Sequence, residues 1–252
     1  GNGIDIFDRR RGLIGGYRPN PTYPENSVSH AALAMAETAD GSLWVGSRQS
    51  GLKRLQAGAK KWQTYTVVDG LPSNQVPSLF LSSKQELWVG TTQGFARWIP
   101  AKNRFESFAT NKDLQNAGYI AAIREDLEGK LWIASERGVW VLDPNTKDLK
   151  QITHLDYDPK SLSNDDVVAI LIDSKGRIWI DTSQGFDLLI RWDGNKAEFE
   201  HISDISHHPN LYMGGNLIED RSGRIWSQWF IYDPNSRQLD VLPKSAGIDL
   251  GT

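Results

Sequence analysis

The chain has 252 residues, of which 39% are hydrophobic and 23% charged, and its net charge at pH 7 is −3. A chain this long can bury a substantial core, and its scattered basic residues argue against nucleic acid as a partner, because phosphate binding needs a clustered positive face. The absence of cysteine excludes disulfides, thiolate chemistry and Cys-ligated zinc, and no apolar run approaches the roughly 18 residues that cross a bilayer.

The chain opens on a strand-like segment, Gly3 to Asp8, that matches the later segment Gly138 to Asp143. From there onward a Gly-x-(Leu/Ile)-Trp turn recurs. Its tryptophans are spaced 44, 44, 47 and 47 residues apart, at Trp44, Trp88, Trp132, Trp179 and Trp226. Periods of this length belong to propeller blades or to helical solenoids, so the local pattern must decide between them.

The local pattern is that of short strands. Each unit has an apolar run, a polar turn, the Trp strand, a second turn that usually contains glycine, and two further strands rich in Val, Ile, Trp and Phe. No segment keeps a helical apolar period over three turns. The pattern predicts one four-stranded antiparallel meander per unit, which is a propeller blade.

Three units depart from this pattern. The second has Ser82-Ser83-Lys84-Gln85 where others have Asp and Gly, which predicts a different or looser turn. The fourth carries extra residues between Gly185 and Trp192, which predict a bulge or a longer connection. The fifth is shortened around residues 228–230 and lacks the second turn's glycine.

We therefore expect an all-β chain, a β-propeller of four-stranded antiparallel blades with about five and a half blades present, as a fragment of a seven-bladed ring. Residues 1–252 would form a single propeller segment. Its half blade covers residues 3–18, and its whole blades cover about 28–66, 75–109, 118–152, 166–202 and 213–243. The last residues, 244–252, would connect to a further blade.

Two segments, Asp69 to Val76 and Tyr157 to Val167, precede the apolar run and Trp turn of their units. Together they resemble the two-component regulator propeller repeat. The resemblance implies a non-catalytic, ligand-sensing periplasmic region of a bacterial inner-membrane receptor. It also implies a membrane helix, a histidine kinase or diguanylate cyclase output, and a homodimer in the full-length receptor.

Several motifs have both a catalytic and a structural interpretation. The repeat tryptophans could stack on sugars, but their recurrence at one strand position indicates packing between blades. The Asp-box of sialidases has Asp two residues before Gly, whereas Asp173 and Asp220 precede Gly by three. His207 and His208 lack a third ligand and are typical of a solvated loop.

Virginiamycin-type lyases are propellers with a similar strand signature, but no sequence pattern gives His30, His154 or His201 a lyase role. A lyase, a glycosidase or a pure protein-interaction scaffold remains the alternative. We expect no cofactor, no metal and no membrane contact by this segment.

By analogy with other propellers, a ligand would bind at the channel mouth, where inter-blade loops meet the loops between second and third strands. The polar candidates in these loops are Arg48, Gln49, Asn74, Gln75, Gln93, Asn116, Tyr119, Glu136, Arg137, Asn164, Asp165, Gln184 and Tyr212. Their amides and aromatic rings suit a carbohydrate or another small polar ligand. The alternative for each residue is an ordinary solvated loop position.

Overall fold

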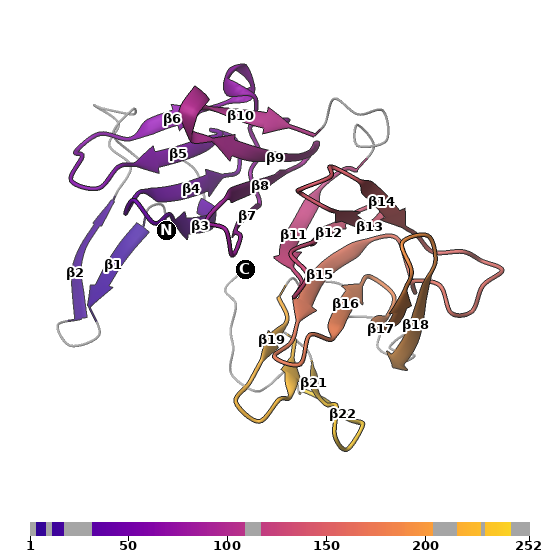
Figure 1. Cartoon of the computed structure of the whole chain (residues 1–252). Coiled ribbons are helices and arrows are strands. Elements are labelled where there is room, and N and C mark those ends of the chain that lie inside the picture. Colours follow the sequence, from indigo (N-terminus) through magenta and orange to yellow (C-terminus); the bar gives the residue numbers. More distant parts are fainter. Residues whose placement is uncertain are drawn as a thin grey trace. The chain divides into compact units, whose positions relative to one another are not determined.

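The computed structural model of the chain describes residues 4–8, 12–17, 32–108, 117–203, 216–227 and 230–242. Within these ranges nearly all regular structure is β-strand, with two short 3₁₀ turns, η2 (Val67–Asp69) and η3 (Pro100–Lys102). Five four-stranded sheets form, and in each the neighbouring strands follow chain order (Figure 1). The all-β, bladed fold predicted from the sequence is confirmed.

The chain divides into two compact units, residues 1–123 and 124–252. The first unit begins with the antiparallel pair β1 (Ile4–Asp8) and β2 (Gly12–Tyr17). Its first four-stranded sheet contains β3 (Ala32–Glu37), β4 (Leu43–Ser47), β5 (Leu52–Leu55) and β6 (Gln63–Tyr65). Its second contains β7 (Ser78–Leu81), β8 (Leu87–Thr91), β9 (Gly94–Ile99) and β10 (Arg104–Ser107).

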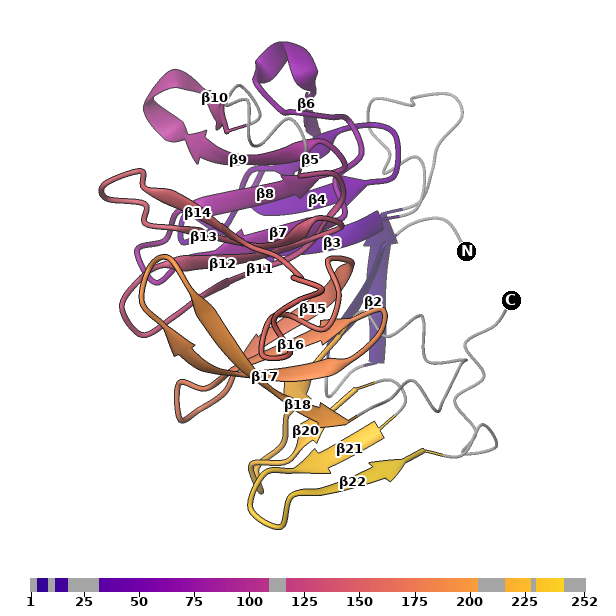
Figure 2. The same ribbon diagram turned by 90° about the vertical axis from the view of Figure 1, so that its right-hand side faces the viewer.

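The remaining three sheets belong mainly to the second unit, and Figure 2 shows them from another side. The third sheet contains β11 (Ile120–Glu125), β12 (Leu131–Ser135), β13 (Gly138–Leu142) and β14 (Leu149–Ile152). The fourth contains β15 (Val167–Ile172), β16 (Ile178–Thr182), β17 (Phe186–Trp192) and β18 (Ala197–Ser203). The fifth contains β19 (Ile218–Glu219), β20 (Ile225–Trp226), β21 (Phe230–Asp233) and β22 (Gln238–Val241).

The first hairpin of each blade closes with one recurring turn. In the fourth blade Asp173 N donates to Arg177 O (3.0 Å) and Gly176 N donates to Asp173 O (2.9 Å), with Gly176 at φ 77°. The Asp173 carboxylate also accepts the Trp179 indole N–H at 2.8 Å. The same indole bond forms in the third and fifth blades, so the turn and the Trp are fixed together.

The prediction of a different or looser turn in the second blade is wrong. Ser82 N donates to Glu86 O (3.0 Å) and Gln85 N donates to Ser82 O (2.8 Å), which reproduces the backbone bonds of the other blades. Gln85 takes φ 63°, where the other blades place glycine. The second blade lacks the bond between the turn carboxylate and the indole, since it has no Asp at this position. The buried Trp88 Nε1 therefore has no hydrogen-bond partner among the described residues.

The repeat tryptophans pack between sheets, as predicted. Trp44, Trp88, Trp132 and Trp179 are at most 2% exposed. In the first unit Trp44 contacts Trp98 of the next sheet at 5.0 Å between ring centroids. In the second unit Trp179 contacts Tyr232 of the next sheet at 5.6 Å. These rings form the hydrophobic core between neighbouring blades.

The fourth blade has the irregularity that its sequence predicts. The pairing of β17 with β18 shifts register twice, between Phe186 and Asp187 and between Leu189 and Arg191. Both strands have seven residues, and the resulting long hairpin is visible in Figure 2. Register shifts of this kind bend and twist a strand pair locally.

Candidate functional site

In the first unit, the loops predicted to surround the channel mouth lie side by side, and we call them the rim loops. The β4–β5 loop contacts the segment before β7, because Gly51 N donates to Asn74 O (2.8 Å). On the other side of that segment, Thr92 N donates to Gln75 O (3.2 Å). The structure thus gathers five of the predicted residues on one rim: Arg48, Gln49, Asn74, Gln75 and Gln93.

The second unit repeats the arrangement. Gly138 N donates to Asp165 O (2.6 Å), and Ser183 N donates to Asp166 O (2.9 Å). These bonds gather Glu136, Arg137, Asn164, Asp165 and Gln184. Tyr119 is half-buried just before β11, and Asn116 and Tyr212 lie outside the described residues, as do His207, His208 and His30.

Three of the rim side chains hold the backbone. Asn74 Oδ1 accepts a bond from Val67 N (3.0 Å), and Asp165 Oδ1 accepts the equivalent bond from His154 N (2.6 Å). Asn164 Oδ1 accepts bonds from Asp166 N and from the Ser183 hydroxyl. These side chains tie the incoming inner strand to the preceding blade.

Another group of rim side chains points to solvent and makes no hydrogen bond to any other described residue. This group contains Arg48, Gln49, Gln93, Arg137 and Gln184, all exposed. They present guanidinium and amide groups, which bind hydroxyl or carbonyl oxygens. Their exposure leaves these groups open to contact from solvent.

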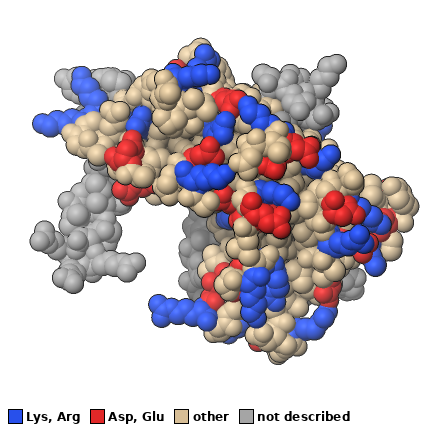
Figure 3. Space-filling view, in the orientation of Figure 1, with Lys and Arg blue, Asp and Glu red and all other residues tan. Residues whose placement is uncertain are grey.

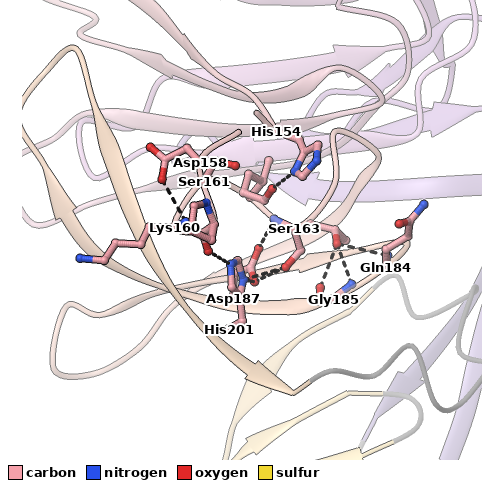
Figure 4. A network of polar contacts seen from close by, with 12 residues as sticks. His154, Asp158, Lys160, Ser161, Ser163, Gln184, Gly185, Asp187 and His201 are labelled. Carbon is pink, nitrogen blue, oxygen red and sulfur yellow. Dashed lines mark hydrogen bonds and ion pairs between the residues drawn. The ribbon is translucent and has the colours of Figure 1, made fainter. Parts of the chain in front are cut away.

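A polar cluster of the fourth blade was not singled out from the sequence. Asp187, whose side chain is fully buried, accepts bonds from Ser163 N (2.8 Å) and from the Ser163 hydroxyl (2.5 Å). His201 Nδ1 lies 2.6 Å from Asp187 Oδ1, and its Nε2 lies 2.9 Å from Pro159 O. Figure 4 shows Ser163, Asp187 and His201 converging, and we call these three residues the fourth-blade cluster.

Both imidazole nitrogens of His201 face oxygen acceptors, so the ring satisfies both contacts only when it carries a proton on each nitrogen. Burial opposes that charge, but the hydrogen bond and negative charge of Asp187 and the Pro159 carbonyl outweigh it and raise the pKa of His201. These contacts anchor residues 159–163 to β17 and β18, and protonation of His201 makes its contact with Asp187 an ion pair.

The cluster contains Ser, His and Asp but does not form a nucleophilic relay. In such a relay one imidazole nitrogen binds the carboxylate and the other takes the proton of the serine. Here Nδ1 serves Asp187 and lies 2.9 Å from the Ser163 hydroxyl, while Nε2 is occupied by Pro159 O. The serine hydroxyl is directed at the carboxylate, so the arrangement positions a loop.

The sequence did carry a signal for this cluster. Asp187 stands where the second and third blades have Ala96 and Trp140, and Asp181 stands where they have Gly90 and Ala134. Asp181 is 8% exposed, and burial, assisted by the charge of Asp187, raises its pKa to about 8. Acidic residues inside otherwise apolar strands mark the fourth blade as different.

The described residues offer few other candidates for chemistry. Figure 3 shows acidic and basic side chains intermixed over the described part of the face that it draws. Among the described residues, no group of three or more His, Asp or Glu side chains could hold a metal ion. Within the same ranges, no helix has the length and apolarity that a membrane crossing requires.

Residues 70–93 and 161–184 match the family model of the two-component regulator propeller. The resemblance inferred from the sequence is therefore confirmed in two of the five blades. No curated protein has a sequence that matches the chain.

Several solved structures share the fold. An extracellular domain from B. thetaiotaomicron, described as part of a hybrid two-component system, has a TM-score of 0.71 at 22% identity, covering 90% of this chain and 30% of that one. Virginiamycin B lyase from Staphylococcus aureus has a TM-score of 0.68 at 13% identity, covering 97% and 78%. PorZ, a surface component of the type-IX secretion system of Porphyromonas gingivalis, has 0.65 at 14%, covering 90% and 36%. At these identities the likeness shows the propeller fold.

Proposed function

We propose that this chain, which carries two-component regulator propeller repeats, is a ligand-sensing part of a bacterial membrane signalling receptor and acts by binding, without catalysis. The observation that supports this most directly is the family match at residues 70–93 and 161–184. The likeness to an extracellular domain of a two-component system agrees with a periplasmic location. The chain spans 30% of the length of that domain. For the full-length protein we further propose an output domain and a homodimeric receptor.

The proposed ligand contacts the rim. A ligand at the first unit would meet Arg48, Gln49 and Gln93, and a ligand at the second would meet Arg137 and Gln184. Exposed guanidinium and amide groups without a partner in the described chain match a carbohydrate or another small polar ligand. Binding would shift the receptor between conformations according to the difference in ligand affinity between them.

The fourth-blade cluster brings Ser, His and Asp together without the geometry of a catalytic triad. Both imidazole nitrogens of His201 face other oxygen acceptors, so the cluster offers no base for the serine. The fold is shared with a lyase, and at 13% identity that likeness shows the fold alone.

Calorimetric titration with maltohexaose, xylohexaose and arabinohexaose tests the proposal. We expect one of these sugars to bind and to be recovered unchanged, as shown by mass spectrometry. The double variant Arg48→Ala/Gln93→Ala should weaken binding about tenfold or more, while the exposed Lys60→Ala outside the rim should not. Cleavage of a sugar would overturn the non-catalytic proposal, and failure of all three to bind would overturn the carbohydrate ligand.

The receptor part has its own test in the gene. The codons that follow Thr252 should lead to a membrane helix and a kinase or cyclase domain. A stop codon soon after Thr252 would contradict a receptor.

A further inference from the structure

The fourth blade also forms a pocket away from the rim. Its volume is about 260 Å³, and it lies between the end of β14, the connection to β15 and the β17–β18 hairpin. None of the described rim residues lines it. Its walls are formed by Gln151, Ile152, Thr153, Leu155, Tyr157, Asp158, Ser161, Trp192, Asn195, Lys196, Ala197 and Phe199.

The pocket exists because the fourth blade departs from the second. Val67 and His154 are equivalent, since their N–H groups donate to the equivalent side chains Asn74 and Asp165. Between these anchors and the next shared position, the connection has nine residues, 155–163, where the second blade has five, 68–72. The longer connection forms one wall, and the long hairpin forms the opposite one.

The longer connection is fixed in place against β18. Phe199 N donates to Lys160 O (2.8 Å), and the Lys196 ammonium lies 2.9 Å from the Asp158 carboxylate. The Ser161 hydroxyl accepts a bond from Leu155 N (2.9 Å). Figure 4 shows Ser161 and Asp158 in this wall, next to the fourth-blade cluster. A wall held by so many bonds is preorganised, which lowers the entropic cost of binding.

The chemistry of the walls selects a type of ligand. Tyr157 is 83% exposed and Trp192 is half-buried, so both offer aromatic surface to the pocket. The Asn195 side-chain amide is exposed and makes no hydrogen bond to another described residue. Asp158 and Lys196 neutralise each other, so a charged ligand would have to compete with an existing ion pair.

We propose that this pocket is a second binding site, which takes a single neutral polyhydroxylated ring such as a pyranose. One face of such a ring carries C–H groups that pack on an aromatic side chain, and its hydroxyls hydrogen bond to amides. Tyr157 and Trp192 supply the aromatic surface, and Asn195 supplies the amide. The site is independent of the rim, and it requires neither the receptor nor the signalling role proposed above.

Saturation-transfer NMR with methyl glycosides of glucose, galactose, mannose and arabinose tests the pocket. At least one of these should receive saturation, and methyl glucuronide, which is charged, should bind more weakly than methyl glucoside. Tyr157→Ala and Asn195→Ala should each weaken binding about fivefold or more. Both residues are exposed, so neither change should unfold the blade. Val68→Ala, in the equivalent connection of the second blade, is the matched control.

The proposal would be overturned if no methyl glycoside bound to the chain. It would also be overturned if the Tyr157→Ala and Asn195→Ala variants bound the glycoside as tightly as the unmodified chain. The rim variant Arg48→Ala/Gln93→Ala separates the two proposals. It should leave binding of the methyl glycoside unchanged, and loss of binding in this variant would assign the sugar to the rim and overturn the second site.

Discussion

Residues 70–93 and 161–184 match the same family repeat, and several of their hydrogen bonds occur at equivalent positions. Ser73 pairs with Thr92 in the first segment as Asn164 pairs with Ser183 in the second. The fourth blade then adds what the second lacks, namely buried acidic residues, His201 and a longer connection. The residues shared with the family build the blade, and those that depart from it supply the polar groups that are available for function.

At the first turn it is the second blade that departs from the repeat, while the fourth blade follows it. There the fourth blade keeps the Asp173 carboxylate, which accepts bonds from main-chain, guanidinium and indole N–H groups. The second blade has Ser82, whose hydroxyl accepts one bond, from Glu86 N. The same backbone turn is therefore supported by several bonds to the Asp173 carboxylate in one blade and by a single bond to the Ser82 hydroxyl in the other.

The largest expected effect comes from truncating this turn residue. Asp173→Ala would leave the buried Trp179 indole and the Arg177 guanidinium without their acceptor, and should lower the free energy of unfolding by about 3–5 kcal/mol. Ser82→Ala should cost only about 1 kcal/mol. Urea unfolding followed by tryptophan fluorescence measures both, and equal losses would show that the carboxylate does not anchor the turn.

The second blade can be changed to resemble the fourth. Ser82→Asp combined with Gln85→Gly gives Trp88 Nε1 an acceptor and places glycine at φ 63°, so the free energy of unfolding should rise by about 1–2 kcal/mol. Gln85→Ala keeps the unfavourable backbone conformation and should give no gain. If thermal unfolding shows no increase for the double variant, the absent Asp is not what leaves this indole unpaired.

The rim side chains that hold the backbone should behave alike in both units. Asn74→Ala and Asp165→Ala each remove an acceptor for one main-chain N–H, and each should cost about 1 kcal/mol of unfolding free energy. Asn74→Asp keeps an acceptor oxygen and should be nearly neutral. Gln49→Ala and Gln184→Ala, at exposed positions, should change stability by less than about 0.5 kcal/mol. A cost at these two as large as at Asn74 would contradict the division of the rim into holding and solvent-facing groups.

The smallest expected effect is a pH dependence of stability that arises from His201 in the fourth blade. Because the folded chain raises the pKa of His201 above its ordinary value of 6.5, this residue stabilises the second unit fully below that pH. The contribution is lost as the pH rises through the folded-state pKa. The melting temperature should therefore include a decline above pH 6.5 that His201→Gln removes, and NMR titration of the imidazole should show the raised pKa directly. A titration at or below 6.5 would refute the ion pair.

Much of the fold could be predicted because local sequence patterns identify each repeat. The Trp spacing, the apolar runs and the extra residues before Trp192 sufficed for the blades and for the bulged hairpin. The turn at Ser82–Gln85 was predicted wrongly because its two backbone hydrogen bonds, rather than its side chains, determine its conformation. A non-glycine residue can adopt that conformation at a cost of about 1–2 kcal/mol.

The candidate site was only partly predictable, for a different reason. The rim loops share sequence positions, so their grouping follows from the repeat. The fourth-blade cluster joins Ser163, Asp187 and His201, which lie on separate elements and meet only through the shifted register of β17 and β18. Likewise, no sequence pattern shows that the oxygen of Asn74 is occupied by a main-chain N–H of the preceding blade.

At Gly51 the β4–β5 loop lies close to β6, and at Gly138 the β12–β13 loop lies close to β14. This close approach limits which residues the gene can encode at these two positions. Each has a positive φ, and an added Cβ would lie 2.1 Å from Tyr65 O or 2.2 Å from Ile152 O, so every substitution must displace main-chain atoms. In a library of random variants selected for folding, these codons would tolerate no change, whereas their solvent-facing neighbours would vary. The pattern of tolerance would then repeat with the blade, and it could locate blade boundaries in relatives too divergent to align.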